Sequence, residues 1–484
     1  MLCLPCWVCE YVTTYVFQVM AGQEESKDKH QHLVGICMGM CPNAEVRLRQ
    51  REKMIHPLEM ALDSNGQRLN YPQVRAMVKM FSRPAAGQQV KAADVRPVPV
   101  LMKTLRYLLA NVCCRKDVPW ALVYQFVSDR LQAIRQDLCV QRARNLTALQ
   151  IYQAVVRFYI YAHYRTCEHE LKDFDPFLNM KQLLDTLFLV MSLYQELDLF
   201  SNIVASDKVD LTDYTSFSGH DEESEEEDSD SDSKVDDGAE TKIVQDSKAS
   251  EKSTSNGGET TSGLEEDSNT VRHHDDNSSG SDSVRAINTQ EREKVLPSER
   301  ENKKHYDGDI VSCSSLQEEG VALYLLVNLG NEEAIMNAMQ LHHNIKCSKL
   351  VSLTLEMNLA WLTYNYYRVL KLSTCLPPLC QCAFHIHLTV IQRKSLGILN
   401  QSHSCKGQSY SLEQLSEMLL YNNSDHLAQA CTHYGLPAIN GGVIFTKGKF
   451  DYEAPLMKPC HTRRIEDQLA AVPLPDLLLP TLNY

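Results

Sequence analysis

The sequence predicts a mainly α-helical protein whose helical array is interrupted by a long acidic insert and followed by a small mixed helix–strand unit. Three observations predict this architecture. Apolar residues recur at three- and four-residue steps over most of the chain, which indicates helices that bury one face. A central stretch is poor in apolar residues, and the region after residue 400 combines two short helical patterns with glycine-containing turns.

Residues 1–34 are expected to be a disordered or non-native leader outside the fold. The first 20 residues are apolar apart from Glu10, but they lack the basic start of a secretory signal and are marginal in length for a membrane span. Three cysteines among the first nine residues have CxxC spacing without a second pair nearby, so zinc binding is not favoured. No other segment is long and apolar enough to predict a membrane partner.

Two separated regions, 35–204 and 306–400, are predicted to form the first and second parts of the helical array. Their helices are interrupted by proline and by polar turns, as expected for stacked antiparallel helices. The helical stretches are 100–112, 121–140, 146–169 and 180–199 in the first part, and 316–329, 332–343, 348–372 and 383–399 in the second.

The insert, residues 205–305, is rich in Ser, Asp and Glu. Residues 205–290 contain 24 acidic and 7 basic residues, a balance of −17, so the rest of this chain of net charge −14 carries +3. Such a composition buries too little apolar surface to offset the entropy of ordering, and we expect disorder. Ser224 and Ser229 each precede an acidic residue by three positions, which makes them candidate phosphorylation sites.

Residues 401–470 are predicted to form a winged-helix unit, followed by a tail over 471–484. The first helix begins after Ser411, an N-cap candidate with a capping-box glutamine three residues later. A second helix over 423–434 precedes two short strands within 438–450. Two helices and then a hairpin is the order of a winged helix-turn-helix.

Basic residues are concentrated near the N-terminus, since residues 41–150 contain 18 basic and 8 acidic residues. Such surfaces contact phosphates, although more often they are solvated or meet an acidic partner. The second helix of the winged unit has no Arg or Lys, which favours protein packing over DNA recognition. The candidate nucleic-acid contacts are Arg47, Arg49, Arg51, Lys447 and Lys449.

No catalytic constellation is evident. The chain has no phosphate-binding loop, dinucleotide fingerprint, HExxH or GxSxG motif. The 17 cysteines lack regular pairing and are best explained as reduced thiols, and Cys37 and Cys41 have no recognisable base beside them. We therefore predict no enzyme, cofactor, metal or small-molecule substrate. One cluster of soft ligands was weighed as a zinc site, but its spacing favours helix packing: Cys375, Cys380, Cys382, His385, His387 and Cys405.

Three stretches resemble the Sac-three/GANP family across residues 35–200 and 315–470. The first has Cys41 and Pro42, then Glu45 and Arg49; the second has Arg96 and Pro97 before regularly spaced Leu and Thr. The third is a helix dense in mixed charge, with Asp129, Arg130, Arg135, Gln136, Asp137 and Gln141. Before any resemblance is considered, such mixed charge predicts that Asp129, Arg130, Arg135 and Asp137 lock neighbouring helices by ion pairs.

The resemblance implies a helical-repeat array capped by a winged helix, as in PCI domains, and protein partners that include a PCI-domain subunit and a small acidic subunit. The chain is most similar to short Sac-three-domain-containing proteins associated with centrosomes. We therefore expect a non-enzymatic scaffold in centrosome duplication, spindle assembly and mitotic progression, in the cytoplasm and at the centrosome or spindle. The alternative is a subunit of a nuclear messenger-RNA export complex that pairs with a PCI-domain partner and binds RNA.

Overall fold

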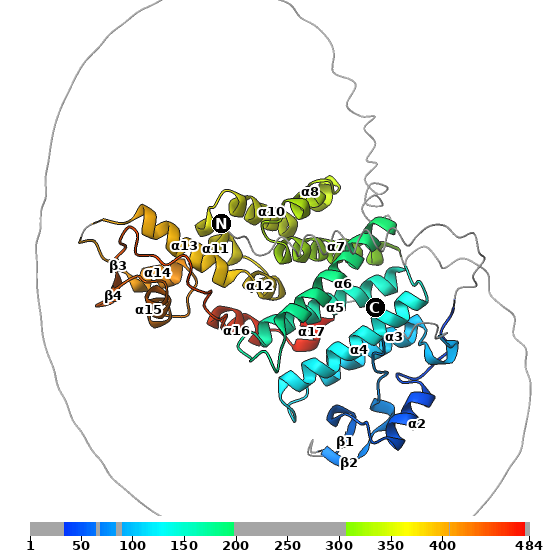
Figure 1. Ribbon diagram of the computed structural model, residues 1–484. Coiled ribbons are helices and arrows are strands. Elements are labelled where there is room, and N and C mark those ends of the chain that lie inside the picture. The colour runs from blue at the N-terminus through cyan, green and yellow to red at the C-terminus, as the bar shows by residue number, and fades with distance from the viewer. Residues whose placement is uncertain (1–32, 64–67, 84–89, 198–305, 406, 480–484) are drawn as a thin grey trace, which may run out of the picture. The chain divides into compact units, whose positions relative to one another are not determined.

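The computed structural model describes residues 33–63, 68–83, 90–197, 306–405 and 407–479. These residues belong to one compact unit and are mainly helical, which confirms the predicted fold class (Figure 1). The predicted leader, the acidic insert and the two candidate phosphorylation sites, Ser224 and Ser229, lie outside the described residues and stay predictions.

The N-terminal segment, residues 35–96, is built from short elements. Pro42 stands in extended conformation before the first of its helices, and β1 and β2 pair antiparallel with Met60 opposite Pro72. The sequence of this segment has turn residues and little helical periodicity. Its short elements therefore depend on contacts with the rest of the protein to hold their positions. The elements are α2 (Asn43–Arg51), η1 (Pro57–Glu59), β1 (Met60–Leu62), β2 (Arg68–Pro72), η2 (Val74–Ala76) and η3 (Ala92–Asp94).

Four long helical stretches follow the N-terminal segment. Pro97 and Pro119 precede two of them, and the side chains of Asn145 and Asp175 cap the other two by accepting main-chain N–H bonds. The central helix of these is buried at every position over 151–156, because neighbours cover it on all sides. The stretches are α3 (Val98–Arg106) continuing into η4 (Tyr107–Val112), α4 (Trp120–Val140), α5 (Leu146–Arg165) and α6 (Pro176–Glu196).

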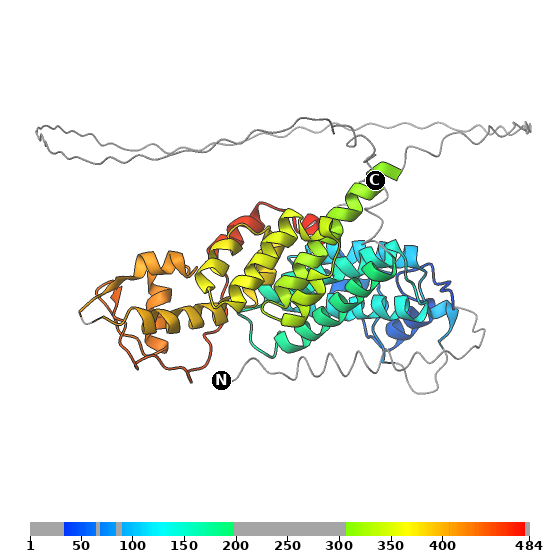
Figure 2. The ribbon, with the colours of Figure 1, turned by 90° about the horizontal axis from the view of Figure 1, so that it is seen from above.

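The second part of the array packs onto the first. α7 contacts α6, and α12 contacts both α5 and α7, so both parts share one core although the insert separates them in sequence. Figure 2 shows these helices side by side. The elements are α7 (Tyr306–Val327), α8 (Glu332–Met339), α9 (His343–Lys346), α10 (Lys349–Leu362), α11 (Tyr366–Ser373), α12 (Pro378–His385) and α13 (Leu388–Ser402).

Two predicted helices are divided in the structure. The predicted helix 348–372 is divided between α10 and α11, because Tyr364 adopts a left-handed conformation with φ of 58° and Asn365 caps a new helix. The predicted helix 383–399 is likewise represented by the end of α12 and most of α13. Apolar periodicity continues through both breaks, and for this reason the sequence pattern did not reveal them.

The element order after α13 is that of a winged helix. It comprises β3 (Tyr410–Ser411), α14 (Leu412–Met418), α15 (Ser424–His433), β4 (Ala438–Ile439) and β5 (Gly442–Val443), with β5 paired antiparallel to both other strands. Gly435 ends α15 with φ of +77°, where a Cβ would lie 2.7 Å from the Lys449 carbonyl oxygen.

Two further helices return from the winged unit to the array. α16 (Arg463–Ala470) packs on α12, and α17 (Leu474–Leu478) packs on α5 and η4. Within the stretch predicted as a tail, Leu477 and Leu478 are therefore buried in the core. Local composition gave no sign of this, because the contacts join residues far apart in the chain.

Candidate functional site

Asp137 is the centre of a buried ion network. Its side chain on α4 is 1% exposed and lies 2.7 Å from Nε of Arg96 and 2.6 Å from Nζ of Lys79. Lys79 also donates to the main-chain carbonyl of Asp94 at 2.6 Å. A buried carboxylate is tolerated when cations and hydrogen bonds replace its lost water. Asp137 thereby fixes both the middle and the end of the N-terminal segment to α4.

Gln141, one turn further along the chain, fixes the start of the same segment. Its Nε2 donates to the carbonyl oxygen of Arg96 at 2.8 Å, and its Oε1 accepts from the main-chain N–H of Gly35 at 3.1 Å. A Cβ on Gly35 would lie 2.4 Å from the carbonyl oxygen of Val95. The close approach of the two backbone stretches therefore requires glycine at this position.

Arg49 and Glu59 form a second buried ion pair within the N-terminal segment. Arg49 also donates to the carbonyl oxygens of Met54 and Val78, and Glu59 accepts from the Val78 N–H at 3.1 Å. Burial opposes the charge of Arg49, but the hydrogen bond and charge of Glu59, together with contributions from Cys41 and Glu45, outweigh burial and raise the pKa of the guanidinium. This pair joins α2 and η1 to the irregular stretch around Val78.

Three more motif side chains bind main-chain groups of residues 80–82. Their carboxylate and amide groups replace the partners that a regular sheet or helix would supply to an irregular backbone. Met80 N donates to Glu45 at 2.9 Å, Phe81 N donates to Asp129 at 3.2 Å, and Gln136 donates to the Ser82 carbonyl oxygen at 2.9 Å.

The predicted helix–helix ion pairs are replaced by a different arrangement. Arg130 pairs with Asp129 and lies 3.6 Å from Glu59 of the N-terminal segment, with its guanidinium 4.3 Å from the centre of the Phe126 ring. Arg135 alone reaches a neighbouring helix, through a 2.7 Å hydrogen bond to Gln182 of α6 rather than an ion pair. The motif charges hold the irregular segment because that segment, unlike a helix, leaves backbone groups unpaired.

Sequence reasoning missed two members of this network, Glu59 and Lys79. Their signal is weak, because each is a single charged residue in a region of short elements. Glu59 has one local indication, since it forms a capping box with His56 three residues earlier.

The candidate thiols are divided between interior and surface, since Cys37, Cys41, Cys380 and Cys382 are buried whereas Cys375 and Cys405 are exposed. The prediction of helix packing therefore does not hold for Cys375 and Cys405. Burial raises the pKa of Cys41 well above its usual range and also raises that of Cys37, so neither is an activated nucleophile. His385 and His387 use ring nitrogens to bond the carbonyl oxygens of Cys460 and Leu326, at 2.9 and 3.0 Å. Within the described ranges, no group of three or more His, Cys, Asp or Glu side chains is placed to hold a metal ion.

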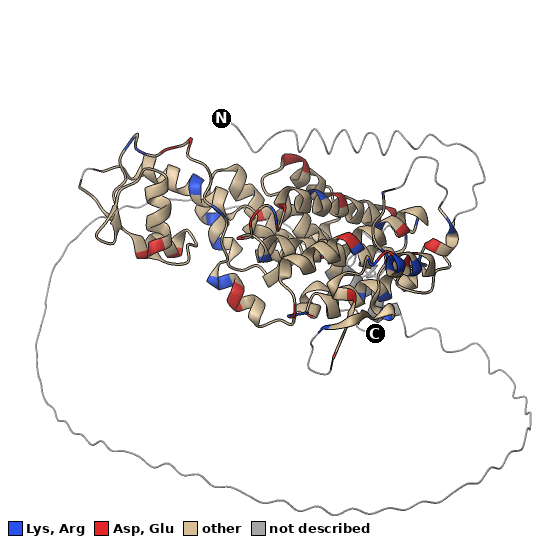
Figure 3. Cartoon of the chain, turned by 60° about the horizontal axis from the view of Figure 1, so that its bottom comes forward, with Lys and Arg blue, Asp and Glu red and all other residues tan. Residues whose placement is uncertain are grey.

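The nucleic-acid candidates divide into exposed and buried residues. Arg47, Arg51, Lys447 and Lys449 are exposed, whereas Arg49 is only 2% exposed and engaged with Glu59, so including it was wrong. Among the described residues from 33 to 150, eleven exposed side chains are basic and only Glu52 is an exposed acid. Figure 3 marks the Lys and Arg positions along the chain in blue and the Asp and Glu positions in red. The basic ones are Arg47, Arg51, Lys53, Arg68, Arg75, Arg83, Lys91, Lys103, Lys116, Arg142 and Arg144.

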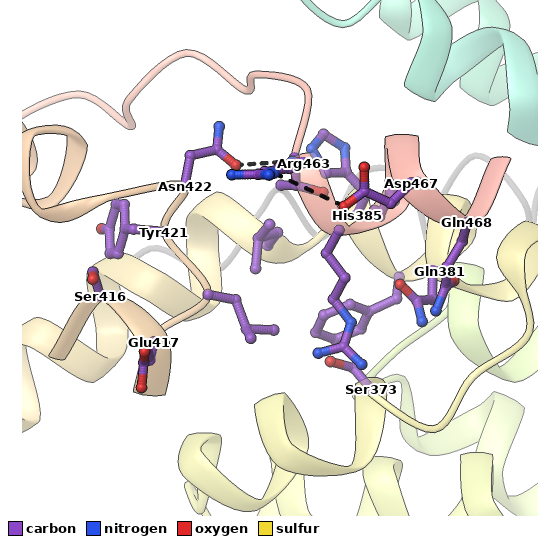
Figure 4. A pocket seen from close by; sticks show the side chains of 16 residues that line it. Ser373, Gln381, His385, Ser416, Glu417, Tyr421, Asn422, Arg463, Asp467 and Gln468 are labelled. Atoms are coloured by element: carbon purple, nitrogen blue, oxygen red, sulfur yellow. Dashed lines mark hydrogen bonds and ion pairs between the residues drawn. The ribbon is translucent and has the colours of Figure 1, made fainter. Parts of the chain in front are cut away.

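A groove of about 570 Å³ lies where the array meets the winged helix. Its walls come from α11, α12 and α13 of the array, from α14 and the loop after it, and from α16. Figure 4 shows Ser416 and Glu417 on one side of this space, and Asp467 and Gln468 of α16 on another. The sequence did not predict it, because its walls are separated by up to 95 residues, from Ser373 to Gln468.

Comparison with known proteins identifies the relatives of this chain. The model of the SAC3/GANP family matches residues 40–214 and 272–440, which is more than half of the chain and includes all the motif residues of the network. The chain belongs to the SAC3/GANP family. This confirms the resemblance recognised from the three motif stretches.

Individual SAC3/GANP relatives align over a shorter region. SAC3 family protein 1 of Schizosaccharomyces pombe is 34% identical over 157 residues, which is 32% of this chain and 15% of that protein. SAC3 family protein B of Arabidopsis thaliana is 28% identical over 177 residues, 36% of this chain and 10% of the relative. Protein xmas of Drosophila melanogaster is 24% identical over 169 residues, 34% and 8% of the two chains.

The aligned region is therefore a small part of each of these relatives.

In this SAC3/GANP chain, none of the helices in the described part combines the length and the apolar composition needed to cross a membrane. The family is one of non-catalytic scaffolds, and its members act by binding other proteins.

Proposed function

We propose that this chain is a non-enzymatic scaffold that assembles protein partners on its helical array and winged helix. The observation that carries the proposal is the use of the motif charges. Asp137, Arg96 and Lys79 neutralise one another in the interior and hold the N-terminal segment, instead of facing a substrate. These buried charges hold the N-terminal segment in the shape that it presents to partners. The partners we propose are a PCI-domain subunit and a small acidic subunit.

The process we propose is centrosome duplication, spindle assembly and mitotic progression, with the protein in the cytoplasm and at the centrosome or spindle. The similarity of the three motif stretches to short centrosome-associated members supports this proposal. Imaging of a tagged chain through the cell cycle tests it. Signal at spindle poles in mitosis is expected, and signal confined to the nuclear rim throughout the cycle would contradict it.

The alternative is a subunit of a nuclear messenger-RNA export complex that pairs with a PCI-domain partner and binds RNA. The basic surface of residues 33–150 supports this alternative, because its eleven exposed cations are accompanied by a single exposed acid. Purification of the tagged chain with its bound subunits distinguishes the two. Recovery of a PCI-domain subunit together with RNA would favour export over the centrosome role.

Neutralising Arg47, Arg51 and Lys53 is predicted to weaken RNA binding and its salt dependence. These residues lie on α2 or just after it and are exposed. Each phosphate contact on a single strand contributes about 0.7 to the slope of log K against log salt, so the triple alanine variant should lose about 2 from that slope. Fluorescence anisotropy of a labelled single-stranded RNA, recorded over a series of salt concentrations, measures this slope.

Two further variants complete this experiment. Lys447→Ala with Lys449→Ala tests the loop that follows β5 of the winged helix, and Lys349→Ala with Lys371→Ala removes two exposed cations of the array as its matched control. If the triple variant and the control give the same slope as the unchanged chain, the basic surface near α2 does not contact RNA.

A further inference from the structure

The neighbouring helices α10 and α11 share an outward face. Nε and Nη2 of Arg368 on α11 donate to Glu356 of α10 at 3.0 and 2.7 Å, and both side chains are exposed enough to mark the outward side of their helices. The opposite side of α11 is buried in the core at Tyr366, Val369, Leu370 and Ser373. We call the surface around the Glu356–Arg368 pair the corner face, because it ends at the turn between the two helices.

Three large apolar side chains lie exposed at the turn end of the corner face. Leu359 is 53% exposed, Tyr367 is 54% exposed and Tyr364, in the turn itself, is 71% exposed. Leu359 follows Glu356 by three residues on α10, a spacing that places both on the same side of the helix. A cluster of exposed aromatic and aliphatic side chains of this kind is typical of the centre of a protein interface.

The backbone conformation of Tyr364 points to a role for its side chain. Its φ is 58°, in the left-handed region, and its N–H bonds to the carbonyl oxygen of Trp361 at 3.0 Å as α10 ends. Glycine is the usual residue in this conformation at a helix end, because a Cβ is unfavourable there. Since most of the Tyr364 side chain is exposed, packing within the chain gives little in return. A bulky residue held in a sparsely populated conformation is typical of a binding surface.

The other end of the corner face is positive. Lys349 at the start of α10 and Lys371 on α11 are exposed, and they lie seven residues before Glu356 and three residues after Arg368, on the same outward side. Residues 349–405 contain five Lys or Arg and one acid, Glu356, and that acid pairs with Arg368. No ion pair joins either lysine to a described residue. Two cations therefore remain for a partner.

The acids of neighbouring elements lie on other sides of the two helices. Glu417 of α14 lines the groove together with Ser373, which belongs to the buried side of α11. Glu332 and Glu333 of α8 follow Gly330, whose N–H bonds at 2.9 Å to Asn358 on the buried side of α10. These acids therefore do not offset the positive charge of the corner face.

We infer that the corner face binds a segment of a partner protein that carries Asp or Glu beside a large apolar side chain. Leu359, Tyr364 and Tyr367 contact the apolar side chain, and Lys349 and Lys371 contact the carboxylates. Tyrosines also stack on nucleic-acid bases, but Leu359 has no π face, so this mixed surface is suited to a protein rather than to RNA. The inference rests on the proposed scaffold function and specifies the chemistry of one of its partners.

The test uses the full chain and a display library of random short peptides. Enriched peptides are expected to combine Leu, Phe or Trp with Asp or Glu. A synthetic copy of one should bind about tenfold more weakly to Lys349→Ala with Lys371→Ala, and also to Tyr364→Gly. Glycine suits the left-handed backbone, so Tyr364→Gly should weaken binding without lowering the melting temperature. Lys447→Ala with Lys449→Ala, two exposed cations of the winged unit, is the matched control and should bind as tightly as the unchanged chain.

Four outcomes would overturn the inference. They are enrichment of basic peptides, binding that neither corner-face variant weakens, the absence of any enriched peptide, and displacement of bound peptide by single-stranded RNA. Co-purification keeps the two proposals separate. If one of these outcomes is found while subunits still co-purify with the unchanged chain, the corner-face proposal fails and the scaffold function stands. If no subunit co-purifies with the unchanged chain, the scaffold function fails.

Discussion

Replacing Asp137 by alanine is expected to destabilise the fold by about 3–5 kcal/mol. The carboxylate is buried and pairs with both Arg96 and Lys79. Its loss leaves these two cations without their acidic partner, and Arg96 is fully buried. Urea denaturation followed by circular dichroism gives the free energy of unfolding of the variant and of the unchanged chain.

The N-terminal segment should respond before the array does. Residues 35–96 depend on Asp137 and Gln141 for their attachment to α4, whereas the array has its own apolar core. Limited proteolysis in the absence of urea should cleave this segment of the Asp137→Ala variant first. Glu52→Ala, which removes an exposed acid of the same segment, is the control. Equal stability and equal cleavage of the two variants would refute a structural role for Asp137.

Mild acid is expected to destabilise the protein through three histidines, of which His385 is buried and His163 and His387 are partly buried. Burial is the main cause that lowers the pKa of His163, His385 and His387 to about 4. Their unfolded pKa is about 6.5. Folding therefore keeps them neutral at pH values where the unfolded chain binds protons. The contribution of the neutral rings to the free energy of unfolding is fully present above about pH 6.5. It is lost as the pH is lowered from about 6.5 toward 4.

The magnitude follows from proton linkage. Each histidine contributes up to about 1.4 kcal/mol per pH unit in this window, so the three together contribute up to about 4 kcal/mol per unit. Free energies of unfolding measured in urea between pH 7.5 and pH 5 test the prediction. His387→Gln keeps a donor near the carbonyl oxygens of Leu326 and Val327 but does not titrate. This variant should therefore reduce the change of unfolding free energy with pH by up to about 1.4 kcal/mol per pH unit.

Replacement of the exposed His169 by glutamine is the control, because this ring is not buried in the fold. It should leave the dependence on pH unchanged. A His387→Gln variant whose stability falls with acid as steeply as that of the unchanged chain would show that burial of this ring does not govern the acid response.

Much of the fold could be predicted from the sequence because helices carry local signals. Apolar spacing, proline before a helix and capping residues placed α4, α5 and α6 within a few residues of their observed bounds. Ser411 did the same for the start of the first helix of the winged unit. The breaks between α10 and α11 and between α12 and α13 were missed, since a break that preserves the apolar stripe leaves no periodic signal.

The candidate site was predictable in composition but not in arrangement. The motif residues were named from the sequence, yet their partners lie far along the chain: Arg96 and Asp137 are 41 residues apart, and Gly35 and Gln141 are 106. Whether a charge is buried depends on such contacts. For this reason Arg49 was taken for a phosphate contact although it neutralises Glu59.

The sequence by itself determined that this is a helical protein of the SAC3/GANP family with a winged helix, since periodicity, caps and motifs are written in neighbouring residues. Only the tertiary structure decided what the motif charges bind, that α16 and α17 return to the array, and that a groove forms beside α14. The physical reason is range. Secondary structure follows from residues a few positions apart, whereas burial, ion pairing and grooves depend on segments that meet only when the chain folds.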